Sequence, residues 1–320
     1  MVAKKNGCVM AISYQKLFDP ESATFTQAQT EPSRRFADRT PNAAYVYADE
    51  IVLAVNVAMA TGRPLLIRGP SGSGKSSLAM SVAENLRLNY VEAVVTSRTQ
   101  ARDLQWQVDL LKRLQDAQAR QLSADWRTYV TPGPLWWAFE PNSAKKQMIA
   151  AGVNDIPKGI ERFDAQGKAE PAVLLIDEID KADPDVPNNL LKPLGELRFV
   201  VEELGLLVET EQPPLVFITT NDERDLPSAF LRRCVELVMP SFTFDRLAQV
   251  GRAHFDEADT SLLNAIANFV LGNGGAEGVN PNAAEYLDIV RACLKLDIRP
   301  DTDDFKEMTE IVLMKQGRRR

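Results

Sequence analysis

The hydrophobic positions in the first three quarters of the chain form short continuous runs separated by helical patterns. Runs of this kind are typical of strands buried in a parallel sheet. They lie at residues 64–67, 90–95, 172–176, 215–219 and 235–239. Apolar residues recur at helical spacing over 48–60, 75–86 and 188–197. Strands that alternate with helices predict an α/β fold with a five-stranded parallel sheet.

Between the second and third runs the pattern is less regular. Leu104, Val108, Leu111 and Leu114 follow helical spacing and predict an amphipathic helix. A segment rich in proline, glycine and tryptophan at 131–137 then interrupts the helical pattern. We therefore expect residues 141–170 to form a loop-rich insertion before the third strand.

The pattern after Pro240 is purely helical. Amphipathic stretches at 261–271, 283–296 and 303–315 predict a small C-terminal helical domain. Residues 1–40 show no sustained period and predict a partly ordered arm. The expected organisation is thus an arm at 1–40, an α/β domain at 41–240 and a helical lid at 241–320.

Composition narrows the class of protein without choosing a function. Of the 320 residues, 45% are hydrophobic and 25% are charged, which is ordinary for a globular protein. A net charge of -7 counts against a broad nucleic-acid-binding surface. Three widely spaced cysteines predict neither disulfides nor a zinc site, and no apolar stretch is long enough to span a bilayer. Together with the lack of a signal-peptide pattern, this favours the cytoplasm. The single histidine, His254, is expected to be a surface helix residue.

The most specific motif is GPSGSGKS at residues 69–76, which fits G-x-x-x-x-G-K-[ST]. It follows an apolar strand and opens a helix, which is the context that a phosphate-binding loop requires. Glycines let the backbone N–H groups point at phosphate oxygens, and the helix N-terminus adds partial positive charge. Lys75 is expected to reach the β- and γ-phosphates and Ser76 to bind Mg²⁺. The residues predicted to contact the nucleotide here are Gly69, Pro70, Ser71, Gly72, Ser73, Gly74, Lys75, Ser76 and Ser77.

Two carboxylates, Asp177 and Glu178, follow the third apolar run. Ligands of doubly wound sheets bind at the carboxyl ends of the strands, so both side chains are expected near the phosphates. Asp177 suits Mg²⁺, which prefers few carboxylates and keeps water ligands. Glu178 suits activation of an attacking water. The competing interpretation is a solvated acidic turn, because Asp180 and Lys181 continue the charge.

Two further polar sites follow the fourth strand. Asn221 ends that strand, and it would lie near the γ-phosphate if the strand runs between the first and third strands. Otherwise it is an ordinary turn residue. Arg232 and Arg233 stand just before the fifth strand, where a planar cation could reach the γ-phosphate of a neighbouring subunit. The alternative is a pair of surface arginines.

Taken together, these motifs resemble those of the AAA+ superfamily of ATPases. Their residue sequences resemble the MoxR-like branch of that superfamily. The segments that carry the resemblance are 64–70, 133–137, 177–182, 190–196 and 229–234. The resemblance implies sheet order 5-1-4-3-2, a helical lid, and a ring, usually a hexamer, with ATP at subunit interfaces. It makes Asn221 the sensor-1 residue, favours Arg233 over Arg232 as the arginine finger, and places Tyr45 and Val46 near adenine.

The chain departs from this pattern in its lid. The helix that would begin with a sensor-2 arginine reads PNAAEY from residue 281, and the nearest arginine is Arg291, about two turns later. The resemblance implies a chaperone-like ATPase that remodels a protein partner, such as one with a von Willebrand factor A domain. The departure slightly favours an ATP-dependent switch or scaffold. A nucleic-acid helicase or loader and a small-molecule kinase are further alternatives, which the charge and the Asp177–Glu178 pair respectively disfavour.

Overall fold

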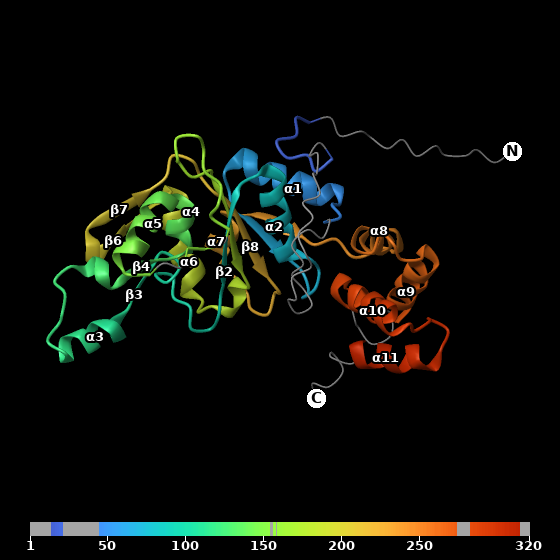
Figure 1. Ribbon diagram of the computed structural model, residues 1–320. Helices are drawn as coiled ribbons and strands as arrows, with labels where there is room; N and C mark the ends of the chain where they lie inside the picture. The colour runs from blue at the N-terminus through green and yellow to red at the C-terminus, as the bar shows by residue number, and fades with distance from the viewer. Residues whose placement is uncertain (1–13, 22–44, 154–155, 158, 274–281, 314–320) are drawn as a thin grey trace.

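A computed structural model gives the structure of the chain (Figure 1). It describes residues 14–21, 45–153, 156–157, 159–273 and 282–313. Most of the predicted arm at 1–40 therefore lies outside the described residues. Within residues 14–21, Phe18 is buried, and its backbone N–H donates to Asn56 Oδ1 at 2.8 Å. This contact anchors the segment on the first helix, α1 (Asp49–Thr61).

The central sheet has five parallel strands in the order β2-β5-β8-β1-β9. Their bounds are β1 (Leu65–Arg68), β2 (Asn89–Val94), β5 (Ala172–Asp177), β8 (Leu215–Thr220) and β9 (Val235–Val238). Counted along the chain these are the first to fifth core strands, so the order read from the other edge is 5-1-4-3-2. The predicted fold class and strand order are confirmed, and β8 lies between β1 and β5.

The sheet is buried on both faces, because its strands are apolar at successive positions. In β5 all six residues are buried, and alternate side chains enter two different clusters. Val173 and Leu175 pack with α1 and α2 (Lys75–Leu86) on one face. Leu174 and Ile176 pack with α4 (Pro134–Phe139) and α6 (Asp185–Glu196) on the other. The sheet is thereby fixed between two helical layers, and its carboxyl edge holds the polar strand ends.

The predicted helix through Leu104 and Leu114 is wrong in its first half. Residues Trp106–Val108 form strand β3, which pairs antiparallel with β4 (Val130–Pro132), and helix α3 covers only Leu110–Gln118. Leu104 and Trp106 are both buried in the core, and the side chain of Asp109 caps α3 by accepting from Lys112 N at 2.8 Å. The packing of Trp106 and the cap at Asp109 therefore end the strand and start the helix where hydrophobic spacing suggested one continuous helix.

The segment predicted to be a break and the insertion predicted to be loop-rich contain two helices, α4 and α5 (Pro141–Ala150). Proline stands at the first helical position of each, where its missing N–H costs nothing and its fixed φ favours the helix. The prolines therefore start helices here. A second unpredicted feature is the hairpin of β6 (Arg198–Val201) and β7 (Leu206–Glu209). Short helical turns complete this part of the chain: η1 (Trp126–Thr128), η2 (Ile179–Lys181), η3 (Glu202–Leu204) and α7 (Ser228–Leu231).

The C-terminal region is helical, as predicted, and lies to one side of the sheet (Figure 1). Its helices are α8 (Phe244–His254), α9 (Thr260–Asn273), α10 (Ala283–Leu296) and α11 (Asp303–Leu313). No amphipathic stretch was predicted over α8, although its last residue, His254, was expected on a helix. The four helices bury a hydrophobic cluster of their own around Leu247, Ile266 and Tyr286. Across the ranges that the structure describes, no helix is both long and apolar enough to cross a membrane.

Asn89 fixes the segment before β5 against β2, and its replacement by alanine is expected to destabilise the fold. The side chain is fully buried; Nδ2 donates to the carbonyls of Arg162 and Glu170, and Oδ1 accepts from the N–H groups of Glu161 and Arg162. Asn89→Ala removes four part-buried hydrogen bonds to the backbone and should lower the free energy of unfolding by about 2–4 kcal/mol in urea titrations. Asn142→Ala is the control, because the hydrogen bond that it donates to Gly167 O is exposed; equal losses in both variants would contradict this role.

Candidate functional site

The loop between β1 and α2 curls tightly because two of its glycines adopt left-handed backbone angles. Gly72 has φ 78° and Gly74 has φ 90°, a region that other residues rarely enter. A methyl group on Gly72 would lie 2.9 Å from Asn282 Oδ1, and one on Gly74 would lie 3.4 Å from the Tyr45 ring. The loop therefore forms a cradle of backbone that side chains would fill.

Lys75 lies at the start of α2 and is almost fully buried, with 7% of its surface exposed. Its Nζ donates to the carbonyls of Gly69 at 2.7 Å and Pro70 at 2.8 Å, and to Asn221 Oδ1 at 2.8 Å. Burial lowers the pKa of this ammonium, while the neighbouring carboxylates, Asp177 foremost, act in the opposite direction. The loop thus holds one cation directed across the sheet edge at the end of β8.

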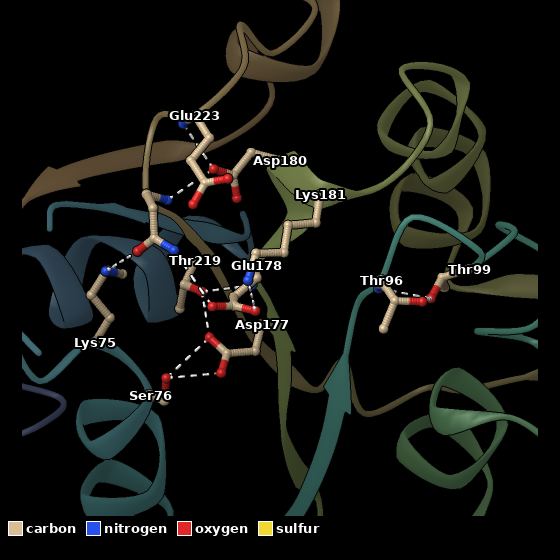
Figure 2. Close-up of polar contacts among 11 residues, drawn as sticks. Lys75, Ser76, Thr96, Thr99, Asp177, Glu178, Asp180, Lys181, Thr219 and Glu223 are labelled. Carbon is tan, nitrogen blue, oxygen red and sulfur yellow. Dashed lines mark hydrogen bonds and ion pairs between the residues drawn. The ribbon is translucent and has the colours of Figure 1, made fainter. Parts of the chain in front are cut away.

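Ser76 and Asp177 meet across the same edge (Figure 2). Ser76 Oγ lies 3.0 Å from both carboxylate oxygens of Asp177, and Thr219 Oγ1 also donates to Asp177 Oδ1. Asp177 ends β5 and is 7% exposed. A hydroxyl and a carboxylate are the hard oxygen ligands that suit Mg²⁺. The donor set therefore fits the predicted ion.

The cradle also contains a buried hydroxyl that fits a phosphate ligand. Ser73 is 5% exposed, and its Oγ has no hydrogen-bond partner in the part of the chain that the structure describes. Since buried polar groups are normally paired, this hydroxyl suits a ligand oxygen. With the loop N–H groups, it gives the cradle the character of an anion site.

Glu178, labelled in Figure 2, and Asn221 complete the polar group. The Glu178 backbone has φ 60°, and its N–H donates to Thr219 Oγ1 at 2.9 Å. Asn221 Nδ2 lies 3.5 Å from Glu178 Oε1, while its Oδ1 accepts from Lys75. From the sequence we expected Asn221 near the γ-phosphate only if its strand lay between the first and third strands. The structure places β8 between β1 and β5, so this condition is met. Left-handed backbone at a non-glycine residue is a recurrent feature of functional sites.

Sequence reasoning missed two residues that support this group. Thr219 binds both Asp177 and the Glu178 backbone. The interpretation of Asp180 as part of a solvated acidic turn is wrong: it is 2% exposed, and its Oδ2 accepts from the N–H groups of Asn221 and Glu223. A threonine at the polar end of β8 was the available signal for the first. No local signal marks Asp180, because its partners lie some forty residues away.

A cavity of about 440 Å³ extends from the cradle to the C-terminal helices. Tyr45 and Val46 line it, with Phe242 and Arg246. The Tyr45 hydroxyl is buried without a partner in the described residues, and burial raises its pKa. His254, expected on the surface, lies half-buried in the cavity wall, where burial and then Arg291 lower its pKa. The cavity wall therefore combines the phosphate cradle with aromatic and apolar side chains, of which Tyr45 lies directly beside Gly74 of the cradle.

The start of α10 carries no basic residue, and the structure shows what stands there instead. Asn282 caps the helix by accepting from Glu285 N at 2.8 Å, and the same side chain packs on Gly72 of the cradle. Arg291 lines the cavity from further along the helix and donates to Asp288 Oδ1 at 2.8 Å. The lid helix therefore touches the phosphate loop through an amide, and arginine enters the cavity from other positions.

Arg232 and Arg233 lie outside this cavity. Both side chains are exposed, and their backbone carbonyls accept from the Arg63 guanidinium at 2.6 and 3.2 Å. Arg233 Nη1 makes a weak bond to Ala229 O at 3.3 Å. The structure thus separates both arginines from the phosphate cradle of their own chain.

A glycine cradle between β1 and α2, facing an acidic strand end across this strand order, defines a P-loop nucleotide-binding fold of the AAA+ type. The family comparison gives the particular group. Residues 64–234, more than half of the chain, match the AAA domain (dynein-related subfamily). The chain belongs to this family, whose fold supports ATP binding and hydrolysis.

Comparison with solved structures gives weaker likenesses. A point mutant of RuvB from Thermotoga maritima has a TM-score of 0.46 and 16% identity, over 83% of this chain and 68% of that one. The RuvB Holliday junction branch migration motor of the same organism gives 0.44 and 16%, over 82% and 67%. At these scores the likenesses add nothing to the family assignment. Among curated proteins none matches the sequence.

Replacing Gly72 with alanine is expected to weaken ATP binding by at least about tenfold. The substitution costs about 1–2 kcal/mol for left-handed backbone, and it also forces the loop away from Asn282. Calorimetric titration with ATP checks the affinity. Gly62→Ala is the matched control, since Gly62 has φ 63° but no atom within 4 Å of the added methyl group. A comparable loss of affinity in both variants would show that backbone strain, and not the cradle, is responsible.

Proposed function

We propose that the chain is an ATPase that binds ATP with Mg²⁺ and hydrolyses it to ADP and phosphate. The observation that carries the proposal is the contact chain Lys75–Asn221–Glu178 beside the Ser76–Asp177 pair. It brings a cation from the start of α2, and an amide and two carboxylates from the ends of β8 and β5, to one cradle. Such a set suits phosphoryl transfer to water, which depends on positioning and on charge stabilisation.

In this proposal the cradle binds the phosphates. The loop N–H groups and Lys75 hold the β- and γ-phosphate oxygens, and Lys75 exchanges its carbonyl partners Gly69 and Pro70 for them. Ser76 and Asp177 would hold Mg²⁺, which when bound supplies positive charge against the phosphates. Tyr45 and Val46, which line the cavity beside the cradle, would contact adenine.

Glu178 and Asn221 act on the attacking water. The carboxylate of Glu178 accepts a proton from the water as its oxygen bonds to the γ-phosphorus and the bond to the β-phosphate oxygen breaks. That proton then passes to the products, so the carboxylate is regenerated. Asn221 Nδ2 orients the Glu178 carboxylate, since the two groups already lie within 3.5 Å.

We further propose that the chain works as a ring, usually a hexamer, in which Arg233 reaches the γ-phosphate of the next subunit. Its exposure and its separation from its own cradle support this role over a role within one subunit. Arg232, equally exposed, is the alternative finger. A permanently charged, planar guanidinium suits the charge that develops in phosphoryl transfer.

Mixing two inactive variants tests the finger. Arg233→Ala should lose turnover alone, and so should Lys75→Ala. A mixture should regain activity, because some interfaces then join an intact cradle to an intact arginine. Phosphate release from each pure variant and from the mixture measures this. Normal turnover by pure Arg233→Ala would exclude Arg233, and the same series with Arg232→Ala would test the alternative.

The resemblance to the MoxR-like branch supports a cytoplasmic, chaperone-like remodeller of a protein partner, such as one carrying a von Willebrand factor A domain. Because α10 has no basic residue at its start, an ATP-dependent switch or scaffold is the second candidate. Size measurement with ATP, with ADP and without nucleotide tests both: each requires an ATP-dependent ring, and a persistent monomer contradicts both. Turnover stimulated by a protein partner would favour the remodeller.

A nucleic-acid helicase or loader is the least favoured hypothesis. The net charge of -7 opposes it. Measuring the binding to single- and double-stranded DNA across a salt series tests this hypothesis directly. A helicase or loader should bind DNA with an affinity that falls steeply with salt, because its phosphate contacts weaken.

A further inference from the structure

The Glu178 carboxylate has a second partner that the proposed reaction does not use. Lys181 Nζ donates to Glu178 Oε2 at 2.7 Å, and the dashed line in Figure 2 marks this contact. The short helix η2, which begins directly after Glu178, places the two residues three positions apart. Both Glu178 oxygens are thus engaged, Oε1 by Asn221 and Oε2 by Lys181. The rotation of the carboxylate is set by these two contacts.

The two partners of Glu178 line different cavities. Glu178 lines the nucleotide cavity, and it also lines a second cavity of about 360 Å³ beyond the ends of β2 and β5. Asn221 lines the first cavity only, whereas Lys181 lines the second only. The ion pair therefore holds one carboxylate oxygen on the side of the second cavity. Water activation needs a free carboxylate oxygen on the side of the phosphates.

This ion pair is built to open easily. The two side chains are 38% and 31% exposed, and partly exposed pairs contribute little free energy because water and salt screen them. The bond to Glu178 is also the main reason that the pKa of Lys181 is raised. Lys181 otherwise has no side-chain hydrogen bond among the described residues.

We propose that Lys181 is a positioning residue that restrains Glu178 on the side of the second cavity and so lowers the basal rate of hydrolysis. The proposal rests on the proposed ATPase function. Glu178 has to exchange Lys181 for the attacking water before it can accept a proton. Lys181 thus sets the fraction of time in which the Glu178 carboxylate is free to bind the attacking water. It contributes nothing to nucleotide binding.

Substitution of Lys181 tests this through kcat and KM. Lys181→Met should raise kcat at saturating ATP about two- to fivefold, since an exposed pair is worth up to about 1 kcal/mol. KM and the affinity for ATP should stay unchanged. Lys181→Arg should restore the wild-type rate, because arginine keeps the charge. Lys181→Gln, a second removal of the charge, should fall between methionine and wild type.

The control removes another cation from the same cavity. Arg224 lines the second cavity but donates to Ala182 O and not to Glu178, so Arg224→Gln should leave kcat at the wild-type value. Unchanged or lower kcat in both Lys181→Met and Lys181→Gln would overturn the restraint, as would an equal rise in Arg224→Gln.

Glu178→Gln separates a failure of the restraint from a failure of the ATPase proposal. If Glu178→Gln turns over ATP at the wild-type rate, the proposed role of Glu178 fails first. If Glu178→Gln is inactive, the gain from Lys181→Met should disappear in the double variant. A gain that persists in the double variant would show that Lys181 acts elsewhere.

Discussion

Glu178→Gln is expected to lower kcat for ATP hydrolysis by about 10²- to 10⁴-fold and to leave ATP affinity nearly unchanged. Glutamine keeps the size of the side chain and can still contact Asn221, but its amide does not accept the proton of the attacking water. The loss is therefore confined to the chemical step. Phosphate release at saturating ATP measures kcat, and calorimetric titration measures affinity on the same preparation.

Glu223→Gln provides the matched control for this variant. Glu223 stands on the loop after β8 and lines the second cavity, and its backbone N–H is bound by Asp180. Removal of this carboxylate changes the local charge equally but leaves the nucleotide cavity intact, so kcat should stay near the wild-type value. Similar rates for wild type and Glu178→Gln would remove Glu178 from the mechanism.

Lys75→Met is expected to weaken ATP binding by roughly 10²-fold, which corresponds to about 2.7 kcal/mol. The ammonium lies within the cradle, bonded to Gly69 O, Pro70 O and Asn221 Oδ1, and a thioether offers no charge and no donor. Hydrolysis at moderate ATP should be lost with it. Calorimetric titration with ATP and Mg²⁺ gives the affinity directly.

Loss of stability has to be separated from loss of affinity in this variant, because Lys75 also binds the Gly69 and Pro70 carbonyls. Lys112→Met is the control, since Lys112 Nζ likewise donates to two carbonyls, Thr128 O and Ala151 O, far along the chain from the cradle. Both variants should unfold at a lower urea concentration than the wild type, but only Lys75→Met should lose affinity for ATP. Undiminished ATP binding by Lys75→Met would contradict the assignment of the cradle.

The sheet could be predicted from sequence because its strands are apolar on both faces. Each residue of β5 is buried, so the run stands out from its surroundings without knowledge of its neighbours. No single apolar run indicates which strands lie beside it. The strand order was therefore predicted from the resemblance to a known family. Local pattern failed at Leu104 to Leu114, where burial of Trp106 in the core overrode spacing that fits a helix.

The residues of the candidate site also fall into a group that local sequence predicts and a group that it does not. The cradle residues and the Asp177–Glu178 pair belong to short local motifs whose geometry the backbone itself dictates, so they could be identified in sequence. Thr219 joins β8 to β5, and Asp180 joins the turn η2 to the loop after β8; both bonds span some forty residues of sequence, and only the fold brings these groups together. The same holds for Asn282, whose contact with Gly72 joins the lid to the cradle.

The most direct test of the account is phosphate release from ATP by the purified chain, with and without Mg²⁺, measured beside ATP binding. The cradle and its acidic pair predict ATP binding that Lys75→Met weakens strongly, together with phosphate release that requires Mg²⁺ and Glu178. Absence of ATP binding at millimolar nucleotide with Mg²⁺ present would contradict the account, because the cradle would then hold no triphosphate.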